Sequence, residues 1–223
     1  MPLIEKQKNE ISNYVVTQHN TLVEANYSAN LTARALKVGR LLISMINPTN
    51  ADLGSIEVDI KKLKRFLGYK DGITWGRFHT DLKDIAKRLN NEPIEINIGK
   101  GETFVAFFIA SYTISLPKGN VSFDISPKLK PYLLELRKNY TSYLLINIPK
   151  LKSSYSIRLY ELLHQYRKFG KRAFSVVDLQ KKWGQTILNT AISKSKFLTK
   201  LKKTSKNIPT LLLHLMKKRM DEK

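Results

Sequence analysis

Serine and basic side chains gather around the start of a predicted helix, and their chemistry suits contact with phosphate groups. The stretch 153–170 reads SSYSIRLYELLHQYRKFG, and Lys150 and Lys152 stand just before it. Free amides at a helix start and the positive end of the helix dipole bind anions, while Lys and Arg supply the charge. The stretch therefore indicates a phosphate-binding surface. A core helix with a solvated basic face is an equally open interpretation.

The candidate DNA contacts form two groups, one in each half of the chain. The first group would lie on the outer face of a helix that follows a turn, and it comprises Arg77, Thr80, Lys83 and Lys87. The second group surrounds the serine-rich helix start and comprises Lys150, Lys152, Ser153, Ser154, Ser156, Arg158, Arg167, Lys168, Lys171, Arg172, Lys181 and Lys182. Some members of the second group are equally well read as plain solvated charges.

Motifs for catalysis or metal binding are not found. The four histidines lack metal-ligand spacing and form no HExxH pair, and there is no cysteine for a disulfide or a zinc site. No GxxxxGK[ST] loop is present, and Glu92 and Glu95 do not build the carboxylate cluster that a nuclease needs. A tyrosine nucleophile is the one open enzymatic option, without the His-rich metal motif that usually accompanies it. We therefore expect no catalytic site, no metal and no cofactor.

The charge of the chain points to an anionic partner and is concentrated in its C-terminal third. The 223 residues carry a formal net charge of +21. Residues 1–150 hold 21 basic and 14 acidic residues, whereas residues 151–223 hold 18 basic and 4 acidic ones. Such an asymmetry is typical of a chain whose second half grips nucleic acid. The segment MPLIEKQKNEISNYVV has no apolar run of signal-peptide length and no window spans a membrane, so a cytoplasmic protein is expected.

Hydrophobic periodicity predicts that 153–170 is one amphipathic helix, capped by Ser153 or Ser154 and ended by Gly170. Its apolar face would comprise Tyr155, Leu159, Leu162, Leu163, Tyr166 and Phe169. Its polar face would point outward and comprise Arg158, Gln165, Arg167 and Lys168.

The elements before this helix follow the order of a winged helix. Residues 15–27 read as extended or irregular. Helices are predicted at 31–46, 60–67 and 73–91, and a strand at 55–59. The last helix would bury the face formed by Trp75, Phe78, Leu82, Ile85 and Leu89, and would carry the ion pairs Arg77–Asp81 and Asp84–Arg88.

Strand-like runs after the third helix supply a wing. Runs 93–98 and 102–116 flank the glycines at 99 and 101, and 121–126 adds a third strand. A helix at 127–136 and a strand at 140–148 follow. The sequence thus predicts an α+β chain of two winged-helix domains, 1–138 and 139–223, the second probably incomplete in the sense that its own wing is not recognisable.

The wording YSIRLYELL, followed by a basic pair, a strand and the short helix FSVVDLQKKWG, resembles plasmid replication initiators of the Rep_3 superfamily. The resemblance runs from about Val16 to about Trp183. It implies two winged helices in tandem, of which the second begins at this helix and the first also mediates dimerisation. The implied function is initiation of plasmid replication by binding repeated origin sequences, with copy control through dimers that repress.

The partners implied by this resemblance are double-stranded origin DNA, host replication proteins and a second copy of the chain, with no membrane. A winged-helix transcriptional repressor at a palindromic operator is the alternative, because it shares all the local physics.

The tail 185–223 departs from the family pattern. It reads QTILNTAISKSKFLTKLKKTSKNIPTLLLHLMKKRMDEK, with no alternating strand and no hairpin glycine. One interpretation is a reading-frame shift, because back-translation of 191–221 read one nucleotide earlier can encode a recognition-type helix followed by a strand. The other interpretation is a genuine, divergent basic tail.

Overall fold

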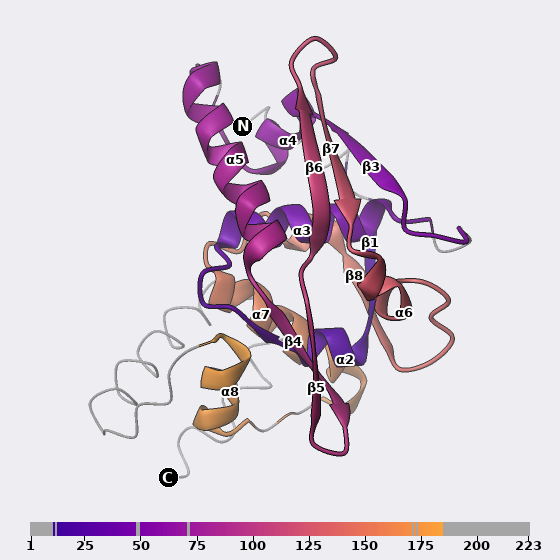
Figure 1. Cartoon of the computed structure of the whole chain (residues 1–223). Coiled ribbons are helices and arrows are strands. Elements are labelled where there is room, and N and C mark those ends of the chain that lie inside the picture. The colour runs from indigo at the N-terminus through magenta and orange to yellow at the C-terminus, as the bar shows by residue number, and fades with distance from the viewer. Residues whose placement is uncertain are drawn as a thin grey trace.

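The computed structural model describes residues 11, 13–47, 50–70, 72–170, 172 and 174–184. Helices and strands alternate through these ranges, as the α+β prediction requires (Figure 1). The strands form a two-stranded ladder, β1-β8, and two three-stranded sheets with the orders β2-β4-β5 and β3-β7-β6. The predicted calls on Lys171 and on the tail 185–223 lie outside the described residues.

The centre of the fold has the element order of a winged helix. Helix α3 (Ala33–Met45) leads into β3 (Ser55–Asp59), which is followed by α4 (Ile60–Phe66) and α5 (Trp75–Asn91). Each helix starts at a side-chain cap, where Thr32, Asp59 and Thr74 accept a backbone amide. This part of the prediction is confirmed, because local caps and apolar spacing define these three helices.

The wing is built differently from the prediction. Strands β6 (Ile109–Ser115) and β7 (Asn120–Ile125) form the long hairpin that pairs with β3 (Figure 1). Strands β4 (Ile94–Gly99) and β5 (Glu102–Ala106) form a separate hairpin with β2. The predicted strand 102–116 is therefore two strands.

Phe108 is the physical reason for this break. Its amide donates to the Leu89 carbonyl at the end of α5, and its carbonyl accepts from the Ser126 amide, so its backbone leaves the β-ladder. The Phe108 ring is 2% exposed and lies against Gly39 of α3, where an added Cβ would stand 3.3 Å from it. A buried aromatic residue thus separates the two hairpins.

Residues 15–27 are more regular than the sequence predicts. They form β1 (Val15–His19), the short helix α2 (Asn20–Val23) and β2 (Asn26–Tyr27). Strand β1 pairs antiparallel with β8 (Tyr140–Leu144), a partner far along the chain. This long-range pairing, rather than local propensity, gives the polar segment its structure.

The described elements after residue 138 share one core with those before it. Beyond the 3-10 turn η1 (Pro127–Leu129), helix α6 (Lys130–Leu133) is shorter than predicted, and the predicted strand 140–148 ends at Leu144 in a turn, η2 (Leu145–Asn147). Helix α7 (Ser154–Gln165) then packs against α2 and α3. The elements η3 (Arg167–Phe169) and α8 (Val176–Lys182) complete the described part. The division into domains 1–138 and 139–223 stays a prediction, because most of the second domain's remainder falls on residues 185–223.

Candidate nucleic-acid interface

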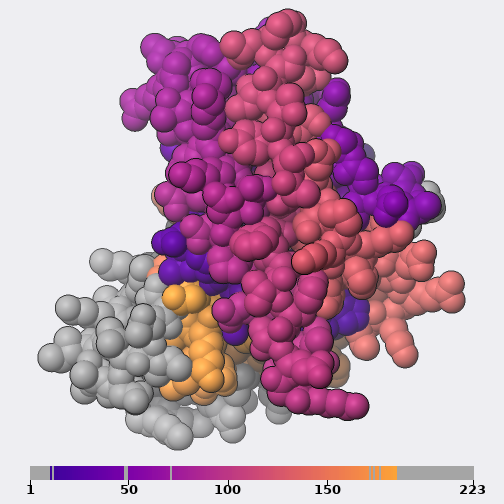
Figure 2. Space-filling view, viewed as in Figure 1, coloured from indigo at the N-terminus to yellow at the C-terminus, as the bar shows by residue number. Residues whose placement is uncertain are grey.

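Helix α5 presents a basic face to solvent and an apolar face to the core. Phe78, Leu82, Ile85 and Leu89 are at most 2% exposed. On the opposite side the four predicted contacts are all exposed, namely Arg77, Thr80, Lys83 and Lys87. Figure 2 shows α5 reaching the surface beside the long hairpin. The 3.6-residue period therefore places every member of this group where a DNA backbone can reach it.

Ion pairing leaves Arg77 available at this face. Asp81 pairs with Arg34 at 3.0 Å and accepts from the Tyr69 hydroxyl at 2.6 Å. The predicted Arg77–Asp81 pair is therefore wrong, whereas Asp84–Arg88 is confirmed at 2.8 Å. Among the described residues Arg77 has no ion-pair partner, so its charge is free to meet an external anion.

The segment before α7 offers a second exposed basic site. Lys150 and Lys152 are exposed, and Ser153 and Ser154 are half-buried. The Ser153 hydroxyl accepts the Ser156 amide at 3.1 Å, and the Ser156 hydroxyl in turn accepts the Ser153 amide at 3.0 Å. This capping box occupies part of the helix start with the chain's own serines. The lysines are thus better placed than the serines for a phosphate.

Two predicted DNA contacts on α7 are buried, and their predicted orientation is wrong. Ser156 is 1% exposed because it serves the capping box, and Arg158 is 0% exposed. All nine residues from Tyr155 to Leu163 are buried, so this helix has no outward basic face over its first turns. At the other end, Phe169, predicted for the apolar face, is 74% exposed because α7 ends at Gln165.

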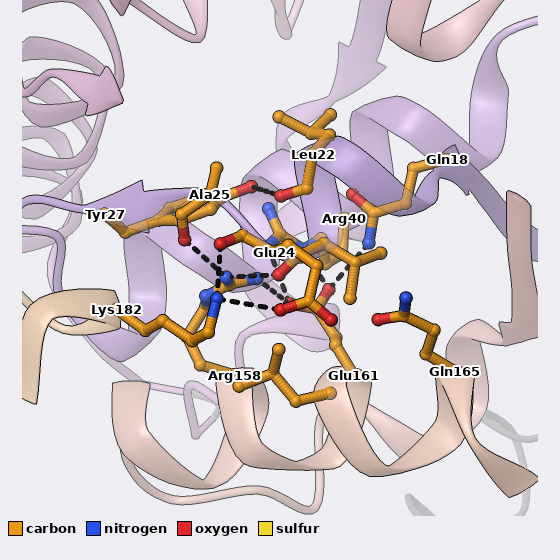
Figure 3. Close-up of polar contacts among 12 residues, drawn as sticks. Gln18, Leu22, Glu24, Ala25, Tyr27, Arg40, Arg158, Glu161, Gln165 and Lys182 are labelled. Carbon is orange, nitrogen blue, oxygen red and sulfur yellow. Dashed lines mark hydrogen bonds and ion pairs between the residues drawn. The ribbon is translucent and has the colours of Figure 1, made fainter. Parts of the chain in front are cut away.

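Glu161 is the centre of a buried ionic cluster that explains the position of Arg158. The Arg40 Nε and Nη2 atoms donate to the two carboxylate oxygens of Glu161 at 2.5 and 2.9 Å. Arg158 Nη1 donates to Glu161 Oε2 at 2.7 Å, and its Nη2 donates to the carbonyls of Val23 and Ala25 at 2.6 and 3.0 Å. Figure 3 shows both arginines converging on this carboxylate.

Two uncharged side chains complete the cluster. The Tyr143 hydroxyl donates to Glu161 Oε1 at 2.5 Å, and Gln18 Nε2 donates to the same oxygen at 3.1 Å. The Arg158 guanidinium also lies 3.9 Å from the centre of the Tyr27 ring, a cation–π contact. Arg40, Glu161, Tyr143, Gln18 and Tyr27 were absent from the sequence-based site, and they join β1, β2, α3, β8 and α7.

The electrostatics of the cluster keep Glu161 ionised. Burial alone would raise the pKa of its carboxyl group, but Arg40, Arg158 and the Tyr143 hydroxyl together lower the pKa to about 2. Burial and the neighbouring carboxylate raise the pKa of Tyr143. The cluster is therefore a fixed arrangement of two cations and one anion, and its role is to join elements rather than to bind DNA.

Glu24 holds two further predicted contacts against the fold. Its carboxylate pairs with Arg172 at 2.6 Å and with Lys182 at 2.7 Å. Lys182 also donates to the Glu24 carbonyl at 2.6 Å, as Figure 3 shows, and Arg172 stacks between Tyr166 and Phe174. Burial opposes ionisation of Glu24, yet the two cations lower its pKa. Arg172 and Lys182 are thus largely engaged within the chain.

The remaining predicted contacts are free of such partners. Arg167, Lys168 and Lys181 are exposed, the first two on η3 and the third on α8. The exposed part of the predicted interface thus comprises Arg77, Thr80, Lys83, Lys87, Lys150, Lys152, Arg167, Lys168 and Lys181.

We expect Glu24→Gln to loosen α8, because it removes both ion pairs while keeping the side-chain shape. Trp183, 4% exposed and packed on Tyr155, reports on this helix. In a Trp75→Phe background the Trp183 emission should shift to the red, with a stability loss of about 1–2 kcal/mol. Glu95→Gln, an exposed carboxylate on β4, is the control and should leave the emission unchanged. Identical spectra for both variants would show that Glu24 does not hold α8.

The described residues contain no group of three or more His, Asp or Glu side chains that could hold a metal ion. Within the same ranges no helix is long and apolar enough to cross a membrane.

Comparison with known proteins gives two matches. The family model described as "Initiator Replication protein, WH1" matches residues 15–164. Among solved structures, "Crystal structure of Pi initiator protein in complex with iteron DNA" superimposes with a TM-score of 0.62 at 18% sequence identity. That match covers 87% of this chain and 86% of the other. At this identity the structural likeness shows the winged-helix fold.

Proposed function

The chain belongs to the initiator replication protein family, and on that premise we propose that it initiates plasmid replication by binding repeated sequences at an origin. The resemblance predicted from YSIRLYELL is confirmed by the family match over residues 15–164. The structural neighbour is an initiator in complex with iteron DNA, and we extend that kind of target to this chain.

The observation that carries the proposal is the exposed basic face of α5. A helix that follows a turn in a winged helix is the element that approaches duplex DNA. Arg77, Lys83 and Lys87 on this face have no ion-pair partner among the described residues, so their charges are available to phosphates. The net charge of +21 adds a sequence-independent attraction to the DNA backbone.

The second proposed contact is the exposed lysine pair Lys150 and Lys152, with Arg167, Lys168 and Lys181 beyond α7. Phosphate contacts from the two groups would set the register of the protein on DNA, and base contacts would set its specificity. The base-reading part of a second winged helix would have to come from residues 185–223.

The proposal extends to partners and place of action. A cytoplasmic initiator without catalysis of its own would need host replication proteins to open and copy the origin. A homodimer formed through the first winged helix would repress, while the monomer would act at the origin. A repressor that binds a palindromic operator would use the same α5 face, and preference for inverted over direct repeats would favour it.

We expect simultaneous replacement of Arg77, Lys83 and Lys87 by Ala to weaken duplex binding. Each lost phosphate contact should reduce the slope of log affinity against log salt by about 0.9, and affinity near physiological salt should fall on the order of tenfold. The measurement is a fluorescence-anisotropy titration of a labelled duplex between about 50 and 200 mM salt.

A charge-matched variant controls for the general field of the protein. Replacing Lys100, Lys128 and Lys138 by Ala removes the same charge from exposed sites off α5. This control should change affinity about twofold or less, with little change of slope. Equal losses in both variants would remove α5 from the interface. Lys150→Ala with Lys152→Ala applies the same test to the second group.

A further inference from the structure

A cavity of about 520 Å³ lies apart from the buried cluster, between α3, α4, the strands β3 and β7, and the turn after β8. Its floor is apolar and includes Leu41, Met45, Val58, Phe66 and Ile146. Figure 1 places α4, β3 and the long hairpin together in the same half of the molecule. A cavity of this size and lining is typical of ligand sites rather than of packing defects.

The rim of the cavity carries three exposed lysines from three separate elements. Lys62 belongs to α4, Lys118 to the turn between β6 and β7, and Lys150 to the segment before α7. Among the described residues none of the three forms an ion pair, and each ammonium group is therefore available to an anion. Arg65 lines the same cavity.

The two acidic residues of the rim are already engaged. The Glu57 carboxylate accepts from the Asn120 side-chain amide at 3.0 Å. Asp59 caps α4 and accepts the Lys62 amide at 2.8 Å. Four basic residues thus face two acidic ones that have hydrogen-bond partners, and the cavity attracts negative charge around an apolar centre.

We propose that this cavity binds an acidic peptide segment of a partner protein, with one bulky apolar side chain inserted as an anchor. The apolar floor would bury the anchor, and the rim lysines would pair with carboxylates on either side of it. Duplex DNA complements the lysines but offers nothing to the floor, because its phosphates and sugars are polar. A central apolar anchor inside a charged rim is the usual arrangement at protein interfaces.

The test uses the full chain and a fluorescein-labelled twelve-residue peptide with a central Phe flanked by Asp and Glu. Anisotropy should show saturable binding. Lys62→Glu with Lys118→Glu should weaken it by about tenfold or more, and replacing the peptide's Phe by Ala should do the same. Neither lysine belongs to the proposed DNA contacts, so duplex binding by this variant separates the result from the proposed function. The control Lys128→Glu with Lys138→Glu reverses two exposed lysines outside the cavity and should change peptide affinity about twofold or less.

Four results would overturn the proposal. Absence of saturable binding would remove the site. An equal loss in the control variant would reduce the effect to general charge. Indifference to the peptide's Phe, together with full displacement by random duplex, would make the rim a phosphate site. Binding that appears only after residues 1–10 are deleted would make the chain's own N-terminal segment the occupant. Thermal melts of both variants verify that folding is retained.

Discussion

Glu161→Gln is expected to destabilise the protein by about 3–5 kcal/mol, because it leaves two buried guanidinium groups without their anion. Arg40 and Arg158 are both 0% exposed, and no solvent can replace the lost charge. Gln retains the size of the side chain, so packing changes little. The measurement is the free energy of unfolding from urea denaturation followed by circular dichroism.

Glu102→Gln, at an exposed carboxylate on the β4–β5 hairpin, is the matched control and should lie within about 0.5 kcal/mol of the parent. A loss below about 1 kcal/mol for Glu161→Gln would contradict the buried ion pairs.

The same cluster predicts a specific acid response. The folded pKa of Glu161, about 2, lies below its ordinary value near 4.5, so the folded state holds the proton less tightly than the unfolded state. The stability from this group is present above pH 4.5, decreases as the pH falls, and is lost on passing about 2. It amounts to about 3 kcal/mol. Glu161→Gln should lack this part of the pH dependence.

Leu162→Ala is expected to cost about 2–5 kcal/mol, as is Leu159→Ala, because each leaves a cavity in a helix that is buried on all sides. Both side chains are 0% exposed, and α7 packs against α2, α3 and β8. Thermal melts and urea unfolding give the loss. Leu144→Ala, at an exposed leucine on β8, is the control and should cost far less. A melt of either core variant that matches the parent would show that α7 does not pack as described.

Local sequence patterns predicted the winged-helix order well, because caps and apolar spacing are short-range signals. On α5 the apolar residues recur every three or four positions, and that period alone assigned the buried face and the exposed basic face correctly. On α7 the same method failed for Arg158. Its partners Val23 and Ala25 lie 135 and 133 residues away, and Arg40 is 121 residues from Glu161. Helical periodicity carries no information about such pairs.

A local signal on α7 was nevertheless available. Arg158 and Glu161 stand three residues apart, the spacing of a helix ion pair, among residues that are otherwise nearly all apolar. An ion pair within so apolar a helix indicates burial. The division of 102–116 into two strands had no comparable signal, because it depends on the packing of Phe108 against α3.

The central claim is that the chain binds repeated origin DNA, with general affinity from its exposed basic faces and base readout from the part after residue 184. If the tail is out of frame, the chain as written should bind duplexes weakly and without preference, because electrostatic binding ignores sequence. A version with the frame restored should prefer one repeated site, because base readout returns.

The most direct test is a competition assay of both versions against duplexes with direct repeats from the plasmid origin, with inverted repeats, and with random sequence. We expect the restored version to select direct repeats by about a hundredfold or more over random duplexes, while the present chain selects none. Equal discrimination by the two versions would show that the present tail is functional and would contradict the frameshift. Failure of both versions to prefer direct repeats would contradict the proposed initiator function.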